Sequence, residues 1–277
     1  MSDRVSFIEL GARDRAKAIL DEGTFRELLG PFDGIMDPWL EPQGIVPQAD
    51  DGMVVARGTV DGRPTVVIAI DGAFQGGSMG EVSGAKMAGA LELAAEDARA
   101  GRPVQAVLCL ETGGVRLQEA NLGLAAIADI HAAIVDLRRY VPVIGVIAGT
   151  VGCFGGMSIA AGLCSYLVVT REARLGLNGP QVIEQEAGIA EYDSRNKPFI
   201  WRMTGGEIRA RTDLADHLVA DDEKAVRRAV QVFAQKGVPA VFRSDQYEKY
   251  LPKVCAFDTS KQADTEEILK FFGVEDK

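Results

Sequence analysis

Two glycine-rich segments carry the residues with the clearest chemical potential. They are Glu111-Thr112-Gly113-Gly114-Val115-Arg116 and Val151-Gly152-Cys153-Phe154-Gly155-Gly156, and each lies between an apolar run and a helical pattern. At the start of a helix the first backbone N–H groups have no partner within the helix, so they can hold an anion. Paired glycines also let the main chain approach a ligand closely. Both segments therefore predict turns whose amides stabilise a negatively charged oxygen.

A third loop, Gly76-Gly77-Ser78-Met79-Gly80, matches the GxSxG nucleophile elbow of α/β-hydrolases. An elbow follows its strand directly, whereas here the expected strand stops near Asp71 and several loop residues intervene. A catalytic triad also needs a downstream histidine, and His217 is the candidate in the expected order. His131 lies within a helical pattern, where we expect a structural role. A serine hydrolase is therefore the weaker interpretation of this loop.

The composition excludes several classes of protein. The chain has 277 residues, 47% of them hydrophobic, which is enough for one large domain. Its formal charge is −10, so it lacks a long-range positive field, and we expect neither nucleic acid nor a membrane surface as a partner. The four cysteines and two histidines show no zinc-site spacing, which predicts no metal site and no disulfide framework. With no apolar secretory core near Met1, a cytoplasmic location is expected.

The longest uncharged stretch, residues 141–170, is long enough to span a bilayer. It is interrupted by Pro142 and six glycines and lacks a flanking aromatic belt. Strands that are covered on both faces are apolar throughout. We therefore interpret the stretch as a buried strand, a glycine loop, a short helix and a second buried strand.

The elements that position these loops follow a regular order. An amphipathic helix is expected over residues 11–29, ended by Gly30-Pro31, and a loop or docking arm over 31–51. Asp61-Gly62 predicts a hairpin turn. Strands are expected over 53–60, 65–70, 104–110, 143–148 and 166–170 and briefly beyond 171, and helices over 81–100, 117–139, 157–162, from 181 and over 222–236. Alternation of strands and helices predicts a parallel sheet with right-handed crossovers.

Four blocks in this order resemble the carboxyltransferase family of acyl-CoA carboxylases, β-subunit type. The blocks are Gly76-Gly77-Ser78-Met79-Gly80 with Gly84-Ala85-Lys86, Gly113-Gly114-Val115-Arg116-Leu117-Gln118-Glu119, Gly155-Gly156, and Gly179-Pro180-Gln181-Val182-Ile183-Glu184-Gln185. Residues 111–121 are similar to the malonate decarboxylase β-subunit branch, whereas carboxylases tend to have Ser-Gly-Gly-Ala-Arg. Bacterial carboxylase β subunits are also expected to begin with a four-cysteine zinc ribbon, and no cysteine precedes Cys109.

This resemblance implies an α/β, crotonase-like fold of repeated ββα units. The expected organisation is an N-terminal helix and docking arm over residues 1–50, then a crotonase-like carboxyltransferase domain with C-terminal helices over 51–277. The implied enzyme is a malonyl-S-acyl carrier protein decarboxylase, in which this β subunit works with a homologous γ subunit. The alternative is a carboxyltransferase β subunit that moves the carboxyl group to or from biotin. A noncatalytic scaffold for the γ subunit is a third interpretation.

The implied chemistry is loss of CO2 from a malonyl thioester, which leaves acetyl-S-acyl carrier protein. The acyl group is carried on a phosphopantetheine-like arm, of the phosphoribosyl-dephospho-CoA type, on an acyl carrier subunit, and no cofactor is expected to bind this chain directly. Electrons from the broken bond enter the thioester carbonyl, so amides that stabilise the enolate oxygen lower the barrier. We assign Gly155 and Gly156 to that oxygen, and Gly113 and Gly114 to the same pocket or to the departing carboxylate.

Six further residues are predicted to contact the substrate: Arg116, Cys153, Phe154, Gly76, Gly77 and Ser78. A guanidinium that grips the malonyl carboxylate tightly would stabilise the ground state, so we prefer Arg116 as a clamp on Glu119 or on a loop carbonyl. Cys153 and Phe154 are expected either to pack or to narrow and dry the pocket.

We make two further hypotheses about residues outside the glycine loops. Tyr192 is a candidate proton donor to the enolate, although exposure on the surface is the stronger expectation. A locally basic stretch could guide an acidic carrier protein, with solvated charge as the equal alternative. Its residues are Lys197, Arg202, Arg209 and Arg211.

Overall fold

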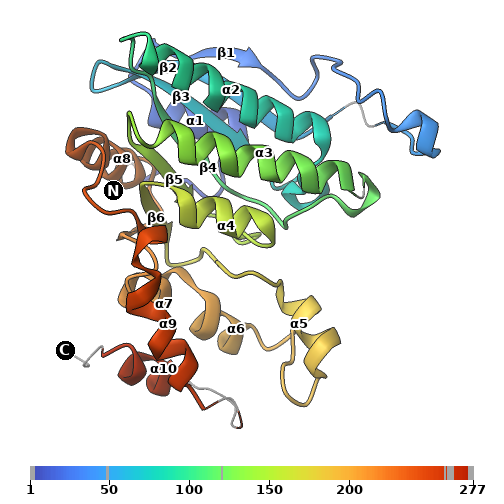
Figure 1. Ribbon diagram of the computed structural model, residues 1–277, viewed down its shortest axis with the longest axis vertical. Coiled ribbons are helices and arrows are strands. Elements are labelled where there is room, and N and C mark those ends of the chain that lie inside the picture. The colour runs from blue at the N-terminus through green and yellow to red at the C-terminus, as the bar shows by residue number, and fades with distance from the viewer. Residues whose placement is uncertain (1–3, 48–49, 120, 259, 261–264, 274–277) are drawn as a thin grey trace.

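The centre of the fold is a seven-stranded sheet whose strands follow one another in chain order (Figure 1). The computed structural model describes residues 4–47, 50–119, 121–258, 260 and 265–273. The strands are β1 (Arg26–Leu29), β2 (Met53–Val60), β3 (Arg63–Ile70), β4 (Gln105–Cys109), β5 (Val143–Ile147), β6 (Tyr166–Thr170) and β7 (His217–Val219). The first three pair antiparallel and the rest are parallel, which confirms the predicted hairpin and the predicted parallel pairing.

Helices cover both faces of this sheet. The described α-helices are α1 (Ala12–Ile19), α2 (Glu81–Arg99), α3 (Asn121–Leu137), α4 (Gly156–Leu163), α5 (Pro180–Ala187), α6 (Lys197–Thr204), α7 (Gly206–Arg211), α8 (Glu223–Lys236), α9 (Tyr247–Ala256) and α10 (Thr265–Phe271), and not all of them contact the sheet. One apolar core lies between the sheet and α2, α3 and α4, and a second lies between the sheet and α1 and α8. Alternate residues of β4 enter different cores, because successive side chains of a strand point to opposite faces.

The helix predicted over residues 11–29 is correct only in its first half. It ends at Ile19, and a turn with Gly23 at a φ of 75° leads into β1, an edge strand that pairs with β2. Apolar spacing alone did not reveal that the backbone of residues 26–29 pairs with β2. The buried apolar residues of α1 belong to the second core, so this helix packs on the same face of the sheet as α8. The predicted boundary near residue 50 remains a prediction.

The uncharged stretch at residues 141–170 has the predicted form, with β5, the short helix α4 and β6 in succession. Among the described residues we find no helix of the length and apolarity required to cross a bilayer. The strand expected just beyond Arg171 is present only as isolated bridges, between Cys153 and Leu175 and between Arg174 and Gly205. The segment that follows folds into α5, α6 and α7, of which only α5 was predicted.

Candidate active site

The two predicted glycine turns lie against each other at the carboxyl ends of β4 and β5. We refer to residues 111–116 as the first glycine turn and to residues 151–156 as the second. A Cβ atom on Gly155 would lie 3.2 Å from the Cα atom of Gly114, and both glycines have positive φ angles. The amide of Phe154 donates to the carbonyl oxygen of Thr112 at 3.0 Å. The two turns are therefore in contact, and the convergence of their amides on one oxygen remains a prediction.

Three of the four amides predicted to be catalytic already have acceptors. The Gly155 amide donates to the Leu177 carbonyl at 2.7 Å, the Gly113 amide to the Gly76 carbonyl at 2.8 Å, and the Gly114 amide to the Thr112 hydroxyl at 3.1 Å. These bonds hold the shape of the turns. Those three amides are therefore hydrogen-bonded within the protein and are not available to an external anion.

Among the amides of residues 113–116 and 153–156, two have no acceptor within the described residues and remain available to a ligand. Gly156 is the first residue of α4, and its N–H has no acceptor within the described part of the chain. The same holds for Val115, whose neighbours Gly114 and Arg116 are both bonded to Met79. Sequence reasoning assigned Gly156 but missed Val115, because it looked for glycines rather than for the residue that follows a glycine pair. The available donors are therefore one from each turn.

The loop that contains Ser78 supports the first glycine turn. The Met79 amide donates to the Gly114 carbonyl, and the Arg116 amide to the Met79 carbonyl, each at 2.8 Å. A Cβ atom on Gly77 would lie only 1.9 Å from the Glu111 carbonyl oxygen, so a side chain there would clash. Ser78 accepts a hydrogen bond from Arg116, whereas His217 lies in β7, beyond three intervening strands. The serine hydrolase interpretation is therefore wrong.

Arg116 has the clamp contacts expected for it. Its buried guanidinium donates to Glu119 at 2.9 Å and to the Ser78 carbonyl at 2.8 Å, and it lies 5.2 Å from the centre of the Phe74 ring. The other carboxylate oxygen of Glu119 accepts the Glu81 amide at the start of α2. These contacts show Arg116 joining the first turn to α2, and its direct contact with substrate remains a prediction.

Glu111 connects both turns to the N-terminal helix. Its carboxylate forms a buried ion pair with Arg15 at 2.8 Å and accepts the Val151 amide at 2.8 Å. A Cβ atom on Gly149 would lie 1.7 Å from this carboxylate, so glycine is required there. Sequence reasoning missed this role because no local pattern reveals a partner 96 positions away.

His131 of α3 supports the second glycine turn. Its Nε2 atom lies 2.7 Å from the Gly156 carbonyl oxygen. Because a carbonyl only accepts, this nitrogen must carry the hydrogen. The structural role expected for His131 therefore operates at the site itself.

Replacing His131 with alanine should lower kcat by about fivefold to tenfold, since one neutral hydrogen bond contributes about 1 kcal/mol. Because the bond holds the residue that carries an available N–H, the loss should appear in kcat rather than in KM. Steady-state kinetics of the assembled enzyme would measure both. The variant His131→Gln keeps a donor and should recover part of the rate. Equal rates for wild type and the alanine variant would contradict a positioning role.

The side chains of Cys153 and Phe154 pack within the fold, which was one of the two expectations for them. Cys153 is fully buried, and its thiol donates to the Met157 carbonyl at 3.2 Å. Burial raises the pKa of this thiol well above its usual value, so the group stays neutral. The Phe154 ring packs on Gly152 and Gly176 and lies 5.5 Å from the Arg174 guanidinium. The contact of these two side chains with substrate remains a prediction.

Tyr192 and the basic stretch lie outside the glycine turns, and the structure agrees with only some of the expectations for them. The Tyr192 hydroxyl is buried and lacks a hydrogen-bond partner among the described residues, so the expectation of an exposed side chain is wrong for this group. Burial raises the pKa of Tyr192, which keeps the hydroxyl protonated. Lys197 and Arg202 are exposed, whereas Arg209 turns inward and donates to the Leu175 carbonyl at 2.9 Å. Arg209 is therefore not part of a basic surface.

A group of acidic side chains surrounds the start of α2. Burial and the neighbouring carboxylates of Asp37 and Glu119 raise the pKa of Glu81 to about 7. Oxygens of Glu81 and Asp37 are buried and lack partners among the described residues. Because the folded state binds this proton more tightly than the unfolded state, the free energy of unfolding should fall as pH rises from about 4.5 to about 7.

The variant Glu81→Gln should remove this part of the pH dependence. We expect it to be more stable than wild type at pH 8, where the wild-type carboxylate is charged in an acidic environment, and to gain little at pH 4. Urea unfolding at several pH values measures the slope directly. The exposed Glu22→Gln variant is a suitable control, and an unchanged slope for Glu81→Gln would contradict the assignment.

Residues 9–276 match the carboxyl transferase domain family. The chain belongs to this family. This member is 42% identical over 241 residues to the malonyl-S-ACP:biotin-protein carboxyltransferase MADC of Malonomonas rubra, an alignment that covers 83% of this chain and 76% of that protein. The family assignment agrees with the blocks that carried the resemblance.

Solved structures are also similar to this chain, in both sequence and fold. A chain of a Pseudomonas malonate decarboxylase hetero-tetramer in complex with malonate is 68% identical, with a TM-score of 0.92 over 97% of this chain and 98% of that chain. A chain of the Pseudomonas malonate decarboxylase MdcD-MdcE hetero-dimer is 63% identical, with a TM-score of 0.77 over 91% of this chain and 97% of that chain. These neighbours confirm the predicted α/β, crotonase-like class.

Proposed function

We propose that this chain is the β subunit of a malonate decarboxylase, which decarboxylates a malonyl group held as a thioester on an acyl carrier protein. The observation that carries this proposal is the pair of available amides, Val115 and Gly156, on two turns in direct contact. The likeness to chains of malonate decarboxylase assemblies supports the choice of substrate.

The proposed reaction places charge where these amides can stabilise it. The bond between the malonyl carboxylate and its neighbouring carbon breaks, CO2 leaves, and the electron pair moves into the thioester carbonyl to form an enolate. Two fixed amides directed at that oxygen each contribute about 3 to 4 kcal/mol to the barrier reduction. Protonation of the enolate carbon then yields the acetyl thioester. The step needs no nucleophile from this chain.

A homologous crotonase-fold subunit, the γ subunit, is proposed to complete the pocket. The second glycine turn is half-exposed at Gly155 and Gly156. Large apolar side chains beside the available amides are exposed as well, with Leu117 at 80% and Leu177 at 61%. Exposed apolar groups around a catalytic turn indicate a surface that another chain covers. Both Pseudomonas neighbours are hetero-oligomers, which agrees with such a partner.

The acyl carrier subunit and its phosphopantetheine-like arm, of the phosphoribosyl-dephospho-CoA type, belong to the same proposal. A slender arm suits this site because the available amides lie beyond the carboxyl ends of the parallel strands β4 and β5. Transfer of the carboxyl group to biotin is the less favoured alternative. It is kept because the Malonomonas rubra relative is named for that transfer.

The decisive experiment combines this chain with its γ partner and a carrier loaded with malonate. We expect release of CO2 and formation of the acetyl carrier in the absence of biotin, with no inhibition by avidin. An absolute requirement for a biotin carrier would instead establish the carboxyltransferase alternative. Full activity of the γ subunit and carrier without this chain would contradict a catalytic role altogether.

A further inference from the structure

Three side chains with hydrogen-bond donors lie together in the segments that follow β6. Arg174 comes four residues after that strand, Tyr192 lies between α5 and α6, and Arg209 belongs to α7. Burial raises the pKa of the Tyr192 hydroxyl, and the nearby positive charges of Arg174 and Arg209 oppose that shift. Both guanidiniums therefore lie close to this hydroxyl. We refer to Arg174, Tyr192 and Arg209 as the donor cluster.

The donor cluster is attached to the backbone that supports the second glycine turn. The Cys153 amide of that turn donates to the Arg174 carbonyl at 2.9 Å. Arg209 donates through its Nε atom to the Leu175 carbonyl, also at 2.9 Å. The Arg174 guanidinium lies 5.5 Å from the centre of the Phe154 ring, which belongs to the same turn. The cluster and the turn with an available amide therefore share one supporting segment.

The donor cluster has N–H and O–H groups that the described residues leave without an acceptor. Arg174 donates through Nε to the Thr150 carbonyl at 3.0 Å and through one Nη atom to the carbonyls of Thr150 and Val151, so its other Nη atom is unused there. Arg209 uses its Nε atom, and neither Nη atom has an acceptor in the same part of the chain. The Tyr192 hydroxyl is buried and has no partner either. Buried donors of this kind favour a ligand with acceptor oxygens.

The charges of the two guanidiniums also lack a counterion among the described residues, where neither forms an ion pair. Glu111 acts on Arg174 from a distance, but it already pairs with Arg15 at 2.8 Å. Both Arg174 and Arg209 are half-buried, and burial lowers the pKa of each. The Trp201 ring lies 4.7 Å from the Arg174 guanidinium. In such partly apolar surroundings an anion gains more from a charged donor than it does in water.

We propose that the donor cluster binds a carboxylate, with its oxygens on the unused Nη atoms of Arg174 and Arg209 and on the Tyr192 hydroxyl. A carboxylate accepts several hydrogen bonds, and guanidinium groups and a phenol are donors of matching geometry. Resting on the function proposed above, the ligand is the carboxylate of the malonyl group. Free malonate presents the same chemistry, and the experiment separates the two sources.

The proposed site acts on substrate binding rather than on the loss of CO2. It contacts a charge that the malonyl substrate has and the acetyl product lacks. A contact that weakens on the way to the transition state stabilises the ground state, so it lowers KM without raising kcat. The donor cluster therefore selects malonyl over acetyl groups.

The first test measures carboxylate binding without catalysis. Calorimetric titration of the full chain with malonate at low salt should give saturable binding, and Tyr192→Phe should weaken it about tenfold, as expected for a hydrogen bond to a charged group. Arg209→Gln should weaken it further. Thermal melting checks that both variants are folded, and Tyr192→Phe, which removes a single oxygen, keeps the test valid if Arg209→Gln misfolds.

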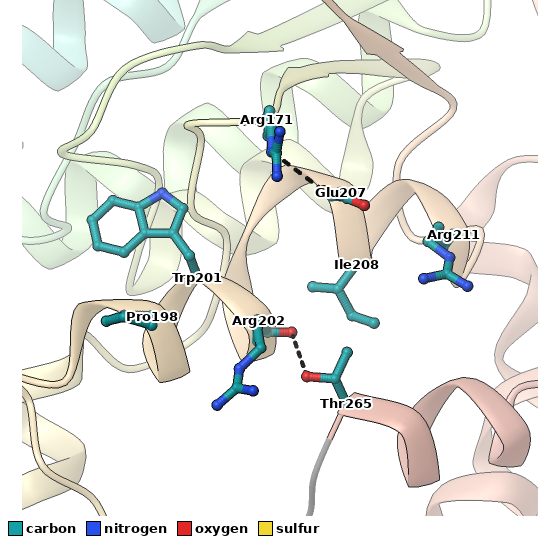
Figure 2. A pocket seen from close by; sticks show the side chains of 8 residues that line it. All are labelled: Arg171, Pro198, Trp201, Arg202, Glu207, Ile208, Arg211 and Thr265. Atoms are coloured by element: carbon teal, nitrogen blue, oxygen red, sulfur yellow. Dashed lines mark hydrogen bonds and ion pairs between the residues drawn. The ribbon is translucent and has the colours of Figure 1, made fainter. Parts of the chain in front are cut away.

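Arg202→Gln is the matched control for the titration. Arg202 is an exposed arginine of α6 that lines a different pocket, of about 430 Å³, to which no member of the donor cluster contributes (Figure 2). We expect this variant to change the affinity for malonate by less than about twofold.

Two results of the titration would overturn the proposal. One is the absence of malonate binding to the wild-type chain. The other is equal affinity, or equal weakening, in Tyr192→Phe, Arg209→Gln and Arg202→Gln, which would place malonate elsewhere or indicate diffuse attraction to positive charge. Neither result depends on CO2 release, so the failure of this site and the failure of the proposed function are distinguishable.

The second test identifies the source of the carboxylate. In the assembled enzyme, Tyr192→Phe should raise KM for the malonyl carrier about tenfold without lowering kcat, and it should leave the affinity for the acetyl carrier unchanged. An unchanged KM together with weaker binding of free malonate would overturn the malonyl group as the ligand and leave free malonate. Equal loss of affinity for the malonyl and acetyl carriers would overturn the carboxylate site in favour of a structural role.

Discussion

Replacing Gly156 with proline is expected to lower kcat by a factor of about 100 to 1,000. The substitution removes the one N–H of the second glycine turn that was both predicted to be catalytic and left available by the fold. Loss of a single oxyanion donor has an effect of this size, about 3 to 4 kcal/mol. Gly156 is the first residue of α4, a position where proline is well tolerated because its missing N–H has no partner within the helix. Single-turnover CO2 release from the assembled enzyme is the measurement.

The matched control is Gly156→Ala, which adds a similar Cβ atom and keeps the N–H. That atom would lie 2.7 Å from a methyl group of Ile127, so both variants strain the same contact between α4 and α3. The alanine variant should therefore show the cost of crowding alone. If the two variants lose activity equally, crowding explains the loss and the Gly156 amide is not a catalytic donor.

Removing the Glu111 side chain is expected to have the largest effect on stability. Glu111→Ala leaves the buried Arg15 guanidinium without its carboxylate and the Val151 amide without its acceptor. Breaking one partner of a buried ion pair costs about 3 to 5 kcal/mol, because the remaining charge is uncompensated. Urea unfolding should show this as a lower midpoint with an unchanged slope.

An exposed ion pair elsewhere in the N-terminal segment provides the comparison. Arg13 and Glu27 pair at the surface, with 45% and 26% of their side chains exposed, so Glu27→Ala should cost no more than about 1 kcal/mol. The double variant Arg15→Met with Glu111→Gln should be more stable than Glu111→Ala, since it removes the uncompensated charge. Similar losses for Glu111→Ala and Glu27→Ala would contradict the role given to burial.

Local chemistry determined much of the fold. Asp61-Gly62 predicted a hairpin because two successive positive φ angles suit these residues, and the structure shows φ angles of 50° and 73° there. Glycines and Pro142 in the uncharged stretch predicted strand, loop, helix and strand, and β5, α4 and β6 follow that order. The four sequence blocks that resemble the carboxyltransferase family also indicated the family and its fold. Each of these signals depends on a few neighbouring residues, so the sequence alone contained it.

Contacts between residues far apart in the sequence determined the remaining features of the fold and of the candidate site. The segment at residues 26–29 is an edge strand because β2 supplies its hydrogen-bond partners, and Glu111 matters because Arg15 is buried beside it. The sequence located both glycine turns, but the tertiary hydrogen bonds showed that Gly155 is occupied and that Val115 is available. Spacing along a chain fixes which amides can point outward. Only the folded neighbours determine which of them still lack an acceptor, because that depends on carbonyls contributed by other loops.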